Sequence, residues 1–186
     1  MPKIFLIMNT IKVKDKFFAP YIPQEKIEAA IRQTAQQINN DYKDKNPLFL
    51  VVLTGAFMFA GELMKHVNIP CRICFIKLTS YSGTTSTEEV KQILGLTTDV
   101  ENEDIIIVED IVDTGNTMKK LTDMLLEKKA KTIEICSMLS KPDVLQYKEM
   151  KPKYVSMEIP NEFILGYGLD YYELGRNLKD IYKIQN

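Results

Sequence analysis

Three acidic residues and a short polar turn lie together near the middle of the chain. Glu109 and Asp110 directly follow four apolar residues, and the turn DTGNT occupies residues 113–117. Carboxylates accept hydrogen bonds from sugar hydroxyls or bind a divalent cation. The backbone N–H groups and hydroxyls of the turn suit a phosphate, which would repel the acids. A phosphorylated sugar with a metal ion is the simplest ligand that uses both groups.

The elements around this stretch are predicted to be a strand and a helix. Residues 105–108, IIIV, are typical of a buried strand of a parallel sheet, which would end at the two acids. After the turn, apolar residues recur at helical spacing at Met118, Leu121, Met124 and Leu125. A helix that begins at the turn favours a phosphate through its dipole, and Gly115 lets the backbone approach a ligand closely. In open α/β sheets, ligands bind at this carboxyl end of the strands.

Composition limits the classes of function. The chain has 186 residues, enough for one domain, and a net charge of −1, which argues against nucleic-acid binding as the main task. No apolar run is long enough to span a membrane, and residues 4–8 are too short for a signal-peptide core, so we expect a cytoplasmic protein. No linker or internal repeat is apparent. The sequence therefore predicts a single domain over residues 1–186.

Two other residue types are expected to be structural. Cys71 and Cys74 form C-x-x-C, but they lie in a predicted strand at residues 71–78, where side chains three apart point to opposite faces. A zinc or redox role is therefore not expected. The only histidine, His66, lies near the end of a predicted helix, so no Ser-His-Asp arrangement is expected either.

Strands and helices are predicted to alternate along the rest of the chain. Such alternation indicates an α/β fold with a doubly wound, mostly parallel sheet. A polar, hydroxyl-rich loop at residues 79–89 is typical of a lid, and a return strand follows at Ile93 and Leu94. Further strands are predicted at residues 48–53, 133–139 and 154–159, and helices at residues 57–67 and from Pro23, as first helical residue, to Tyr42.

The central stretch, IIIVEDIVDTGNTM at residues 105–118, resembles the phosphoribosyl-pyrophosphate motif of type I phosphoribosyltransferases, above all their hypoxanthine-guanine (6-oxopurine) branch. A second match is the spacing FxxGYGLDYxxxxRNL at residues 163–178. The resemblance implies the type I phosphoribosyltransferase fold, with a small hood formed by the N-terminal segment and residues from about 141 to 186. It also implies Mg²⁺-dependent purine salvage, in which hypoxanthine or guanine reacts with phosphoribosyl pyrophosphate to give IMP or GMP and pyrophosphate.

The resemblance assigns residues to each part of this site. The phosphoribosyl group and its 5′-phosphate would contact Glu109, Asp110, Asp113, Thr114, Gly115, Asn116 and Thr117. The pyrophosphate would contact Thr54, Gly55, Ser80, Tyr81 and Arg176. The purine would contact Lys141, Phe163, Ile164 and Asp170, and Mg²⁺ would be held by Glu109, Asp110 and Asp170.

Four of these residues need comment, because they have a specific chemical role, differ from the family or would otherwise be read as core. Asp113 is the only acid inside the turn, so we expect it to act as the general base. Lys141 has donors only, which favours an oxo base over adenine. Many relatives carry Leu-Lys-Gly where this chain has Thr54 before Gly55, so only the backbone contact carries over. Phe163, flanked by aliphatic residues, would be assigned to the core without the resemblance.

Other functions of the same fold stay open at this point. A phosphoribosyltransferase-fold regulator that senses nucleotides keeps the strand, acids and turn but lacks a full purine site. The same chemistry on xanthine or another base is a further alternative. We expect no nucleic-acid or membrane partner, and, by analogy with relatives, a homodimer or homotetramer.

Overall fold

The structure, a computed structural model, describes residues 5–7, 10–80, 90–94, 96 and 98–185. Its main sheet has six strands in the order β6-β5-β4-β7-β8-β9, of which β6 is antiparallel to β5 and the others are parallel. The strands are β4 (Leu48–Leu53), β5 (Arg72–Ser80), β6 (Val90–Leu94), β7 (Asp104–Val112), β8 (Thr132–Ser140) and β9 (Tyr154–Glu158).

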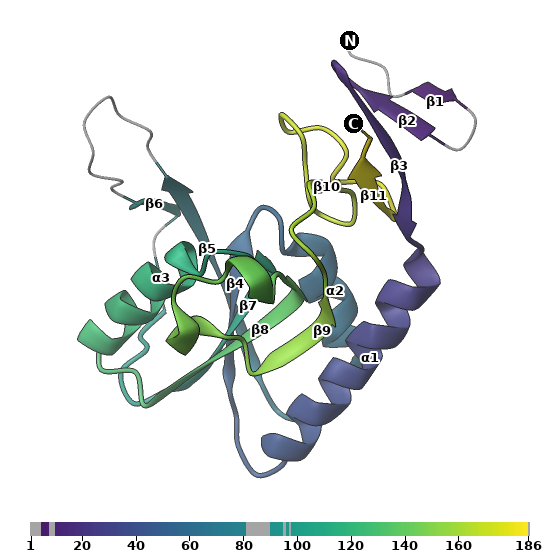
Figure 1. Cartoon of the computed structure of the whole chain (residues 1–186). Coiled ribbons are helices and arrows are strands. Elements are labelled where there is room, and N and C mark those ends of the chain that lie inside the picture. The colour runs from purple at the N-terminus through teal and green to yellow at the C-terminus, as the bar shows by residue number, and fades with distance from the viewer. Residues whose placement is uncertain (1–4, 8–9, 81–89, 95, 97, 186) are drawn as a thin grey trace.

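Helices cover both faces of this sheet. α1 (Gln24–Asp41) and α2 (Phe57–His66) pack on one face, and α3 (Asn116–Glu127) packs on the other (Figure 1). Each face of the sheet has its own hydrophobic core, and alternate residues of β4 point into one or the other. Val51 packs in the core with α1 and α2, whereas Leu50 packs in the core with α3. Burial on both faces explains why β4 is apolar throughout. The predicted doubly wound, mostly parallel α/β fold is confirmed.

The order of the strands creates a crevice at the carboxyl end of the sheet. From β4, the chain places β5 on one side and later places β7, β8 and β9 on the other. Ligands of doubly wound sheets bind outside the carboxyl ends of the strands at such a reversal. The fold therefore places a site above β4 and β7.

A second, antiparallel sheet stands beside this end of the molecule and forms the hood (Figure 1). It joins both ends of the chain, in the order β1-β2-β3-β11-β10, and buries a small core that includes Phe18 and Leu165. Its strands are β1 (Phe5–Ile7), β2 (Thr10–Val13), β3 (Lys16–Ile22), β10 (Ile164–Leu165) and β11 (Ile181–Ile184).

The expected start of the hood at about residue 141 was wrong. Two 3-10 helices, η1 (Pro142–Val144) and η2 (Lys148–Met150), follow β8, and β9 then pairs with β8 in the main sheet. The buried ring of Tyr154 ties β9 to the core beneath α1. The C-terminal part of the second sheet therefore begins only at Ile164.

Most element boundaries differ from the prediction by one or two residues, and β7 differs by more. β7 continues through Glu109 and Asp110 to Val112, because Ile111 and Val112 keep pairing with β8. α1 begins at Gln24, and Pro23 precedes it in an extended conformation. Cys71 lies just outside β5, which begins one residue later.

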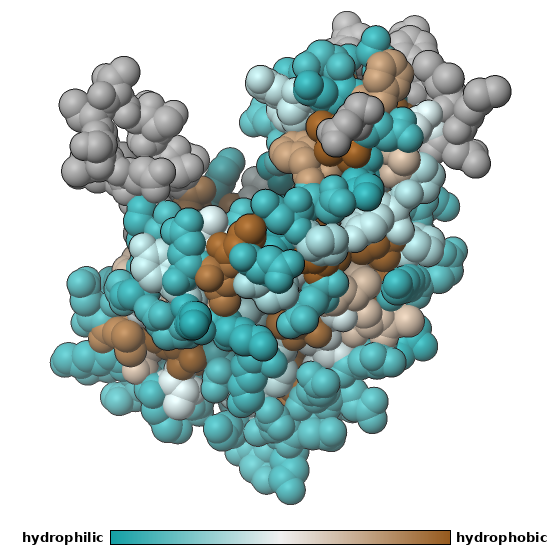
Figure 2. Space-filling model, viewed as in Figure 1, coloured by the Kyte–Doolittle hydropathy of each residue, from teal (hydrophilic) through white to brown (hydrophobic). Residues whose placement is uncertain are grey.

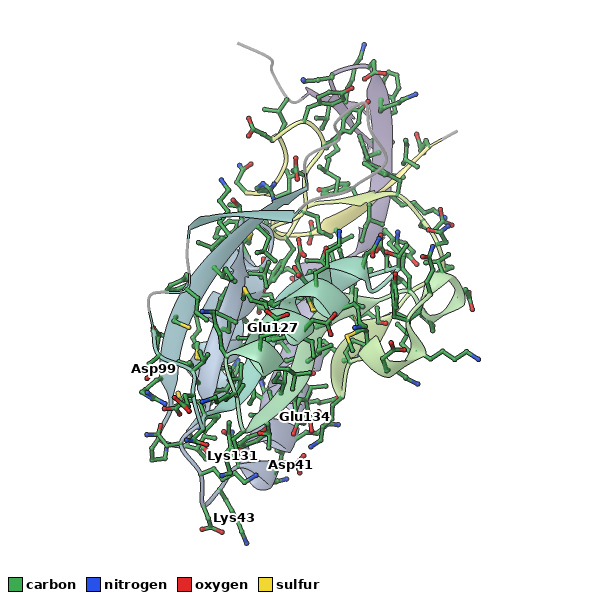
Figure 3. All side chains as sticks on the ribbon, turned by 90° about the vertical axis from the view of Figure 1, so that its left-hand side faces the viewer. Asp41, Lys43, Asp99, Glu127, Lys131 and Glu134 are labelled. Atoms are coloured by element: carbon green, nitrogen blue, oxygen red, sulfur yellow. The ribbon has the colours of Figure 1, made fainter. Side chains whose placement is uncertain are left out.

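The surface at the opposite end of the main sheet is charged. Lys131 pairs with Asp104 at 3.2 Å, and Lys153 lies 3.5 Å from both Asp41 and Glu134. Figure 3 shows Asp41, Lys131 and Glu134 at the end away from the second sheet. The face of the molecule in Figure 2 is mainly hydrophilic, with hydrophobic residues in small separate groups. Within the described part of the chain, no helix is long and apolar enough to cross a membrane.

Candidate active site

A cavity of about 300 Å³ lies at the carboxyl ends of β4 and β7, between the start of α3 and the hood loop, residues 166–180 between β10 and β11. Six of the predicted site residues that line it have charged side chains or a backbone that closely approaches one: Gly55, Glu109, Asp110, Asp113, Asp170 and Arg176. Gly115 and Thr117 of the turn also line it. The cavity thus brings together residues from three predicted subsites.

The acidic pair lies near the carboxyl end of β7, and burial makes the charge of its first member costly. Glu109 is 7% exposed, and its pKa is raised well above the ordinary value by burial and then by the charge of Asp110. The backbone N–H of Asp110 donates to Oε1 of Glu109 at 3.1 Å, and that of Ile111 donates to Oδ1 of Asp110 at 2.9 Å. These bonds aim two adjacent carboxyl groups at the cavity floor, where a cation or hydroxyl donors would stabilise both charges.

The turn at residues 113–117 has the geometry of an anion site. Gly115 precedes α3 in the left-handed conformation, with φ +82°, and has no side chain to cap the helix. The N–H of Asn116 makes only a long hydrogen bond, of 3.5 Å, to Oγ1 of Thr114. A helix leaves its first backbone N–H groups without partners in the helix, and their dipoles favour an anion. The N–H of Thr114 donates to Oδ1 of Asp113, which holds that carboxylate at the edge of the turn.

Residues after β8 brace this turn from behind. A Cβ at Gly115 would lie 3.0 Å from Cδ1 of Leu145 and 3.3 Å from Cβ of Met150. The backbone N–H of Gln146 donates to the carbonyl oxygen of Thr114 at 3.1 Å. Sequence reasoning missed this support, because nothing in the pattern of residues 142–150 indicates that they pack on α3.

The turn after β4 lies between the acidic pair and the hood loop. It follows a cis peptide between Leu53 and Thr54. A Cβ at Gly55 would lie 1.7 Å from Oδ2 of Asp110, and a Cβ at Gly168, where φ is +99°, would lie 2.1 Å from the carbonyl oxygen of Gly55. Both glycines are therefore needed for close backbone approach. The side chain of Thr54 is exposed and does not line the cavity.

The hood loop contributes an ion pair to the cavity wall. Nη2 of Arg176 lies 2.6 Å from Oδ1 of Asp170, and Nη1 donates to the carbonyl oxygen of Gly168 at 2.8 Å. The N–H of Glu173 donates to Oδ2 of Asp170 at 2.6 Å. The guanidinium is thus fixed by two acceptors and faces a cavity that also contains the acidic pair.

Three residues predicted to contact the purine do not line the cavity. Lys141 follows β8; its N–H donates to the carbonyl oxygen of Val112 at 2.9 Å, and its Nζ lies 3.4 Å from Oδ1 of Asn161. The ring of Phe163 is 46% exposed, whereas Ile164 is buried in β10.

The remaining predicted residues divide into two groups. Thr114 and Asn116 belong to the turn but do not line the cavity. Ser80 ends β5, and its side chain, together with Tyr81, lies outside the described residues. Among the described residues, no group of three His, Cys, Asp or Glu side chains could hold a metal ion unaided.

Comparison with known proteins identifies the family. Residues 21–172 match the model of the phosphoribosyl transferase domain. The hypoxanthine-guanine phosphoribosyltransferase of Streptococcus pyogenes is 47% identical over 148 residues, which cover 79% of this chain and 82% of the relative. The chain belongs to the hypoxanthine-guanine phosphoribosyltransferase family. Its resemblance to that family, first seen in the motifs at residues 105–118 and 163–178, is confirmed.

Solved structures of hypoxanthine-guanine phosphoribosyltransferases share the fold. One from Bacillus anthracis is 32% identical, with a TM-score of 0.84, and the match covers 94% of this chain and all of that one. A hypoxanthine phosphoribosyltransferase from Staphylococcus aureus is 37% identical, with a TM-score of 0.83 and coverage of 89% and 90%. The likeness extends over most of the chain, so the predicted type I phosphoribosyltransferase fold is confirmed.

Proposed function

We propose that this chain transfers the 5-phosphoribosyl group of phosphoribosyl pyrophosphate to hypoxanthine or guanine, forming IMP or GMP and releasing pyrophosphate. One observation carries the proposal. A helix N-terminus suited to phosphate, an acidic pair suited to ribose and a fixed arginine suited to pyrophosphate all line one cavity. The names of the relatives, hypoxanthine-guanine phosphoribosyltransferases, support this reaction in purine salvage.

The phosphoribosyl group would bind at the floor of the cavity. Its 5′-phosphate accepts hydrogen bonds from the turn at residues 113–117, including the hydroxyls of Thr114 and Thr117. The ribose hydroxyls donate to Glu109 and Asp110, which favours the ionised form of the buried Glu109. The same carboxylates stabilise the positive charge that develops on the sugar as the bond to pyrophosphate breaks.

The pyrophosphate would lie between the turn after β4 and the hood loop. Arg176 offers a planar, bidentate donor that suits phosphate oxygens. Gly55 offers its backbone N–H, while Thr54 supplies a hydroxyl rather than the cation of many relatives. The family resemblance also assigns Ser80, the last residue of β5, and Tyr81 to this group.

The carboxylates that line the cavity suit an Mg²⁺ ion that is bound partly by the substrate. Mg²⁺ usually keeps several waters and takes one or two carboxylates together with substrate phosphates, so no complete protein cage is needed. Glu109, Asp110 and Asp170, which line the same cavity, would supply these carboxylates. When bound, Mg²⁺ would neutralise the charge of the departing pyrophosphate.

The purine would bind under the hood. Its ring stacks on the exposed face of Phe163, backbone groups of Ile164 read its edge, and Lys141 donates to the 6-oxo group. Asp170 adds an acceptor on the same side. As the bond from the purine nitrogen to the ribose forms, the proton of that nitrogen passes to the carboxylate of Asp113, the general base.

Two further properties belong to the proposal. A homodimer or homotetramer is expected, and exposed hydrophobic side chains on α2 and β5, namely Phe57, Ile73 and Phe75, offer apolar surface for self-association. Size-exclusion chromatography with light scattering tests the assembly.

A cytoplasmic location is supported by Cys71, Cys74 and Cys136, whose free thiols fit a reducing compartment.

A spectrophotometric assay tests the reaction. Purified protein is mixed with phosphoribosyl pyrophosphate, Mg²⁺ and, in turn, hypoxanthine, guanine, xanthine or adenine, with a matched reaction containing EDTA. Product is expected from hypoxanthine and guanine only when Mg²⁺ is present. Product from xanthine or adenine alone would replace the proposed substrate. Absence of product with every base, together with tight binding of GMP, would favour a nucleotide-sensing regulator instead.

A further inference from the structure

An aromatic cluster in the hood holds the ring of Phe163 from two sides. The ring centroid of Phe163 lies 6.2 Å from that of Phe18 on β3 and 5.7 Å from that of Tyr171, which meets it edge-on at 84°. Phe18 and Tyr171 also contact each other, at 6.0 Å. Phe18 is fully buried, whereas Phe163 is 46% exposed. The cluster therefore fixes the orientation of a ring that remains partly open to a ligand.

Tyr171 is tied to the N-terminal hairpin as well. Its hydroxyl donates to Oδ1 of Asp15 at 2.9 Å, across 156 residues of sequence. Asp15 lies between β2 and β3, directly before the strand that carries Phe18. The hydrogen bond lowers the pKa of Asp15, so the carboxylate stays ionised as an acceptor at neutral pH. Tyr171 thus links the C-terminal part of the hood to its N-terminal hairpin.

The turn that carries Tyr171 also carries Asp170. Tyr171 and Leu174 exchange backbone hydrogen bonds of 3.0 and 3.2 Å, and the two residues between them, Tyr172 and Glu173, have positive φ angles. The N–H of Glu173 caps the Asp170 carboxylate. This tight turn presents Asp170 to the cavity and the adjacent Tyr171 to the ring of Phe163. The position of one side chain therefore sets that of the other.

We propose that Tyr171 is a positioning residue of the purine site. Its ring holds Phe163 at the angle required for stacking, and its turn keeps Phe163 in register with Asp170. This inference rests on the proposed function, because it takes Phe163 to stack on the purine. Tyr171 does not line the cavity proposed for the ribose and phosphates, and replacing its ring leaves the backbone of the turn that carries Asp170, so the effect is expected on ligands that contain a base.

The test compares ligands with and without a base. We expect Tyr171→Leu to weaken the binding of IMP about tenfold by calorimetry, while ribose 5-phosphate binds as in wild type, because an edge-on aromatic contact contributes on the order of a tenfold effect. In kinetics, the KM for hypoxanthine should rise by a similar factor, with kcat and the KM for phosphoribosyl pyrophosphate within about twofold. Tyr171→Phe keeps the ring and should restore most of the affinity.

The hydrogen bond to Asp15 has its own variants. Tyr171→Phe and Asp15→Ala should each weaken IMP binding about two- to threefold, since the bond is exposed to solvent. The double variant should be no weaker than either single variant, because both changes remove the same interaction. These variants keep the hood core and test the proposal even if Tyr171→Leu fails to fold.

Phe17→Leu is the matched control. Phe17 is an exposed aromatic residue of β3 that neighbours Phe18, and its ring lies 5.2 Å from Nζ of Lys12, outside the cluster of Phe18, Phe163 and Tyr171, so both ligands should bind as in wild type. Equal weakening of ribose 5-phosphate and IMP, or unchanged IMP binding in the Tyr171 and Asp15 variants, would overturn the proposal. A wild-type protein that binds IMP through Tyr171 but forms no product would instead contradict the proposed reaction alone.

Discussion

The backbone of Gly55 lies directly against the carboxylate of Asp110. A Cβ at residue 55 would be 1.7 Å from Oδ2 and 2.5 Å from Cγ of Asp110, so only glycine fits there without displacing that side chain. Gly168 closes the other side of the same turn, at the carbonyl oxygen of Gly55. The turn after β4 therefore contacts both Asp110, which is proposed to bind the ribose, and the hood loop.

This contact predicts a large loss of activity in Gly55→Ala. The methyl group must push Asp110 out of place, and a displacement of about 1 Å in a catalytic site can cost roughly a hundredfold in rate. Steady-state kinetics should show a fall of at least that order in kcat/KM for phosphoribosyl pyrophosphate. Gly61→Ala is the control, because no atom lies within 4 Å of the added Cβ. It lies inside α2 and should stabilise the protein by about 0.5–1 kcal/mol without changing the kinetics.

Asp113→Asn should separate turnover from binding. The amide oxygen can still accept the hydrogen bond from the N–H of Thr114, so the turn keeps its shape. The amide cannot take the proton of the purine nitrogen, and kcat should fall by about a hundredfold or more. Calorimetry should find IMP binding close to that of wild type. A variant with full kcat would remove Asp113 from the role of general base.

Lys141→Met should affect recognition of the base rather than the sugar. Loss of a charged donor to the 6-oxo group is expected to raise the KM for hypoxanthine and guanine by at least tenfold, since hydrogen bonds to charged groups contribute about 1.5–3 kcal/mol. The KM for phosphoribosyl pyrophosphate should stay within about twofold. Lys148→Met, at an exposed position in η2, is the matched control. Unchanged base KM values in Lys141→Met would show that this cation does not read the oxo group.

Asp104→Asn should change stability without changing activity. The hydroxyl of Thr132 donates to Asp104 at 2.7 Å and Lys131 pairs with it at 3.2 Å, and these contacts lower its pKa below 3.8. A lowered carboxyl pKa contributes stability above the unfolded value that is lost as pH falls through the folded value. The variant should therefore be less stable than wild type at pH 7, by a few tenths to about 1 kcal/mol.

Urea unfolding at pH 7, 5 and 3 measures that difference. The gap between wild type and Asp104→Asn should persist at pH 5 and shrink toward pH 3, because the stability that a lowered carboxyl pKa contributes is lost as pH falls. The kinetic constants should match those of wild type, because Asp104 lies at the end of β7 opposite the cavity. A gap that widens toward pH 3 would contradict the assignment.

Local sequence determined the main elements and the centre of the site. The apolar run at Leu48–Leu53 was predicted with the bounds that the structure has, because a strand buried on both faces needs apolar residues at every position. The turn before α3 was equally readable, since a small polar turn followed by a helical pattern indicates a helix N-terminus with free N–H groups. In both cases the signal lies within about ten consecutive residues.

Tertiary structure alone decided which distant segments meet. Nothing near Gly55 in the sequence indicates that Asp110 lies against it, and nothing near Tyr171 indicates Asp15. The extension of β7 past its acids depended on pairing with β8, and the late start of the hood depended on pairing of β9 in the main sheet. Hydrophobic periodicity specifies the face that an element buries, whereas its partner is chosen by the packing of the whole chain.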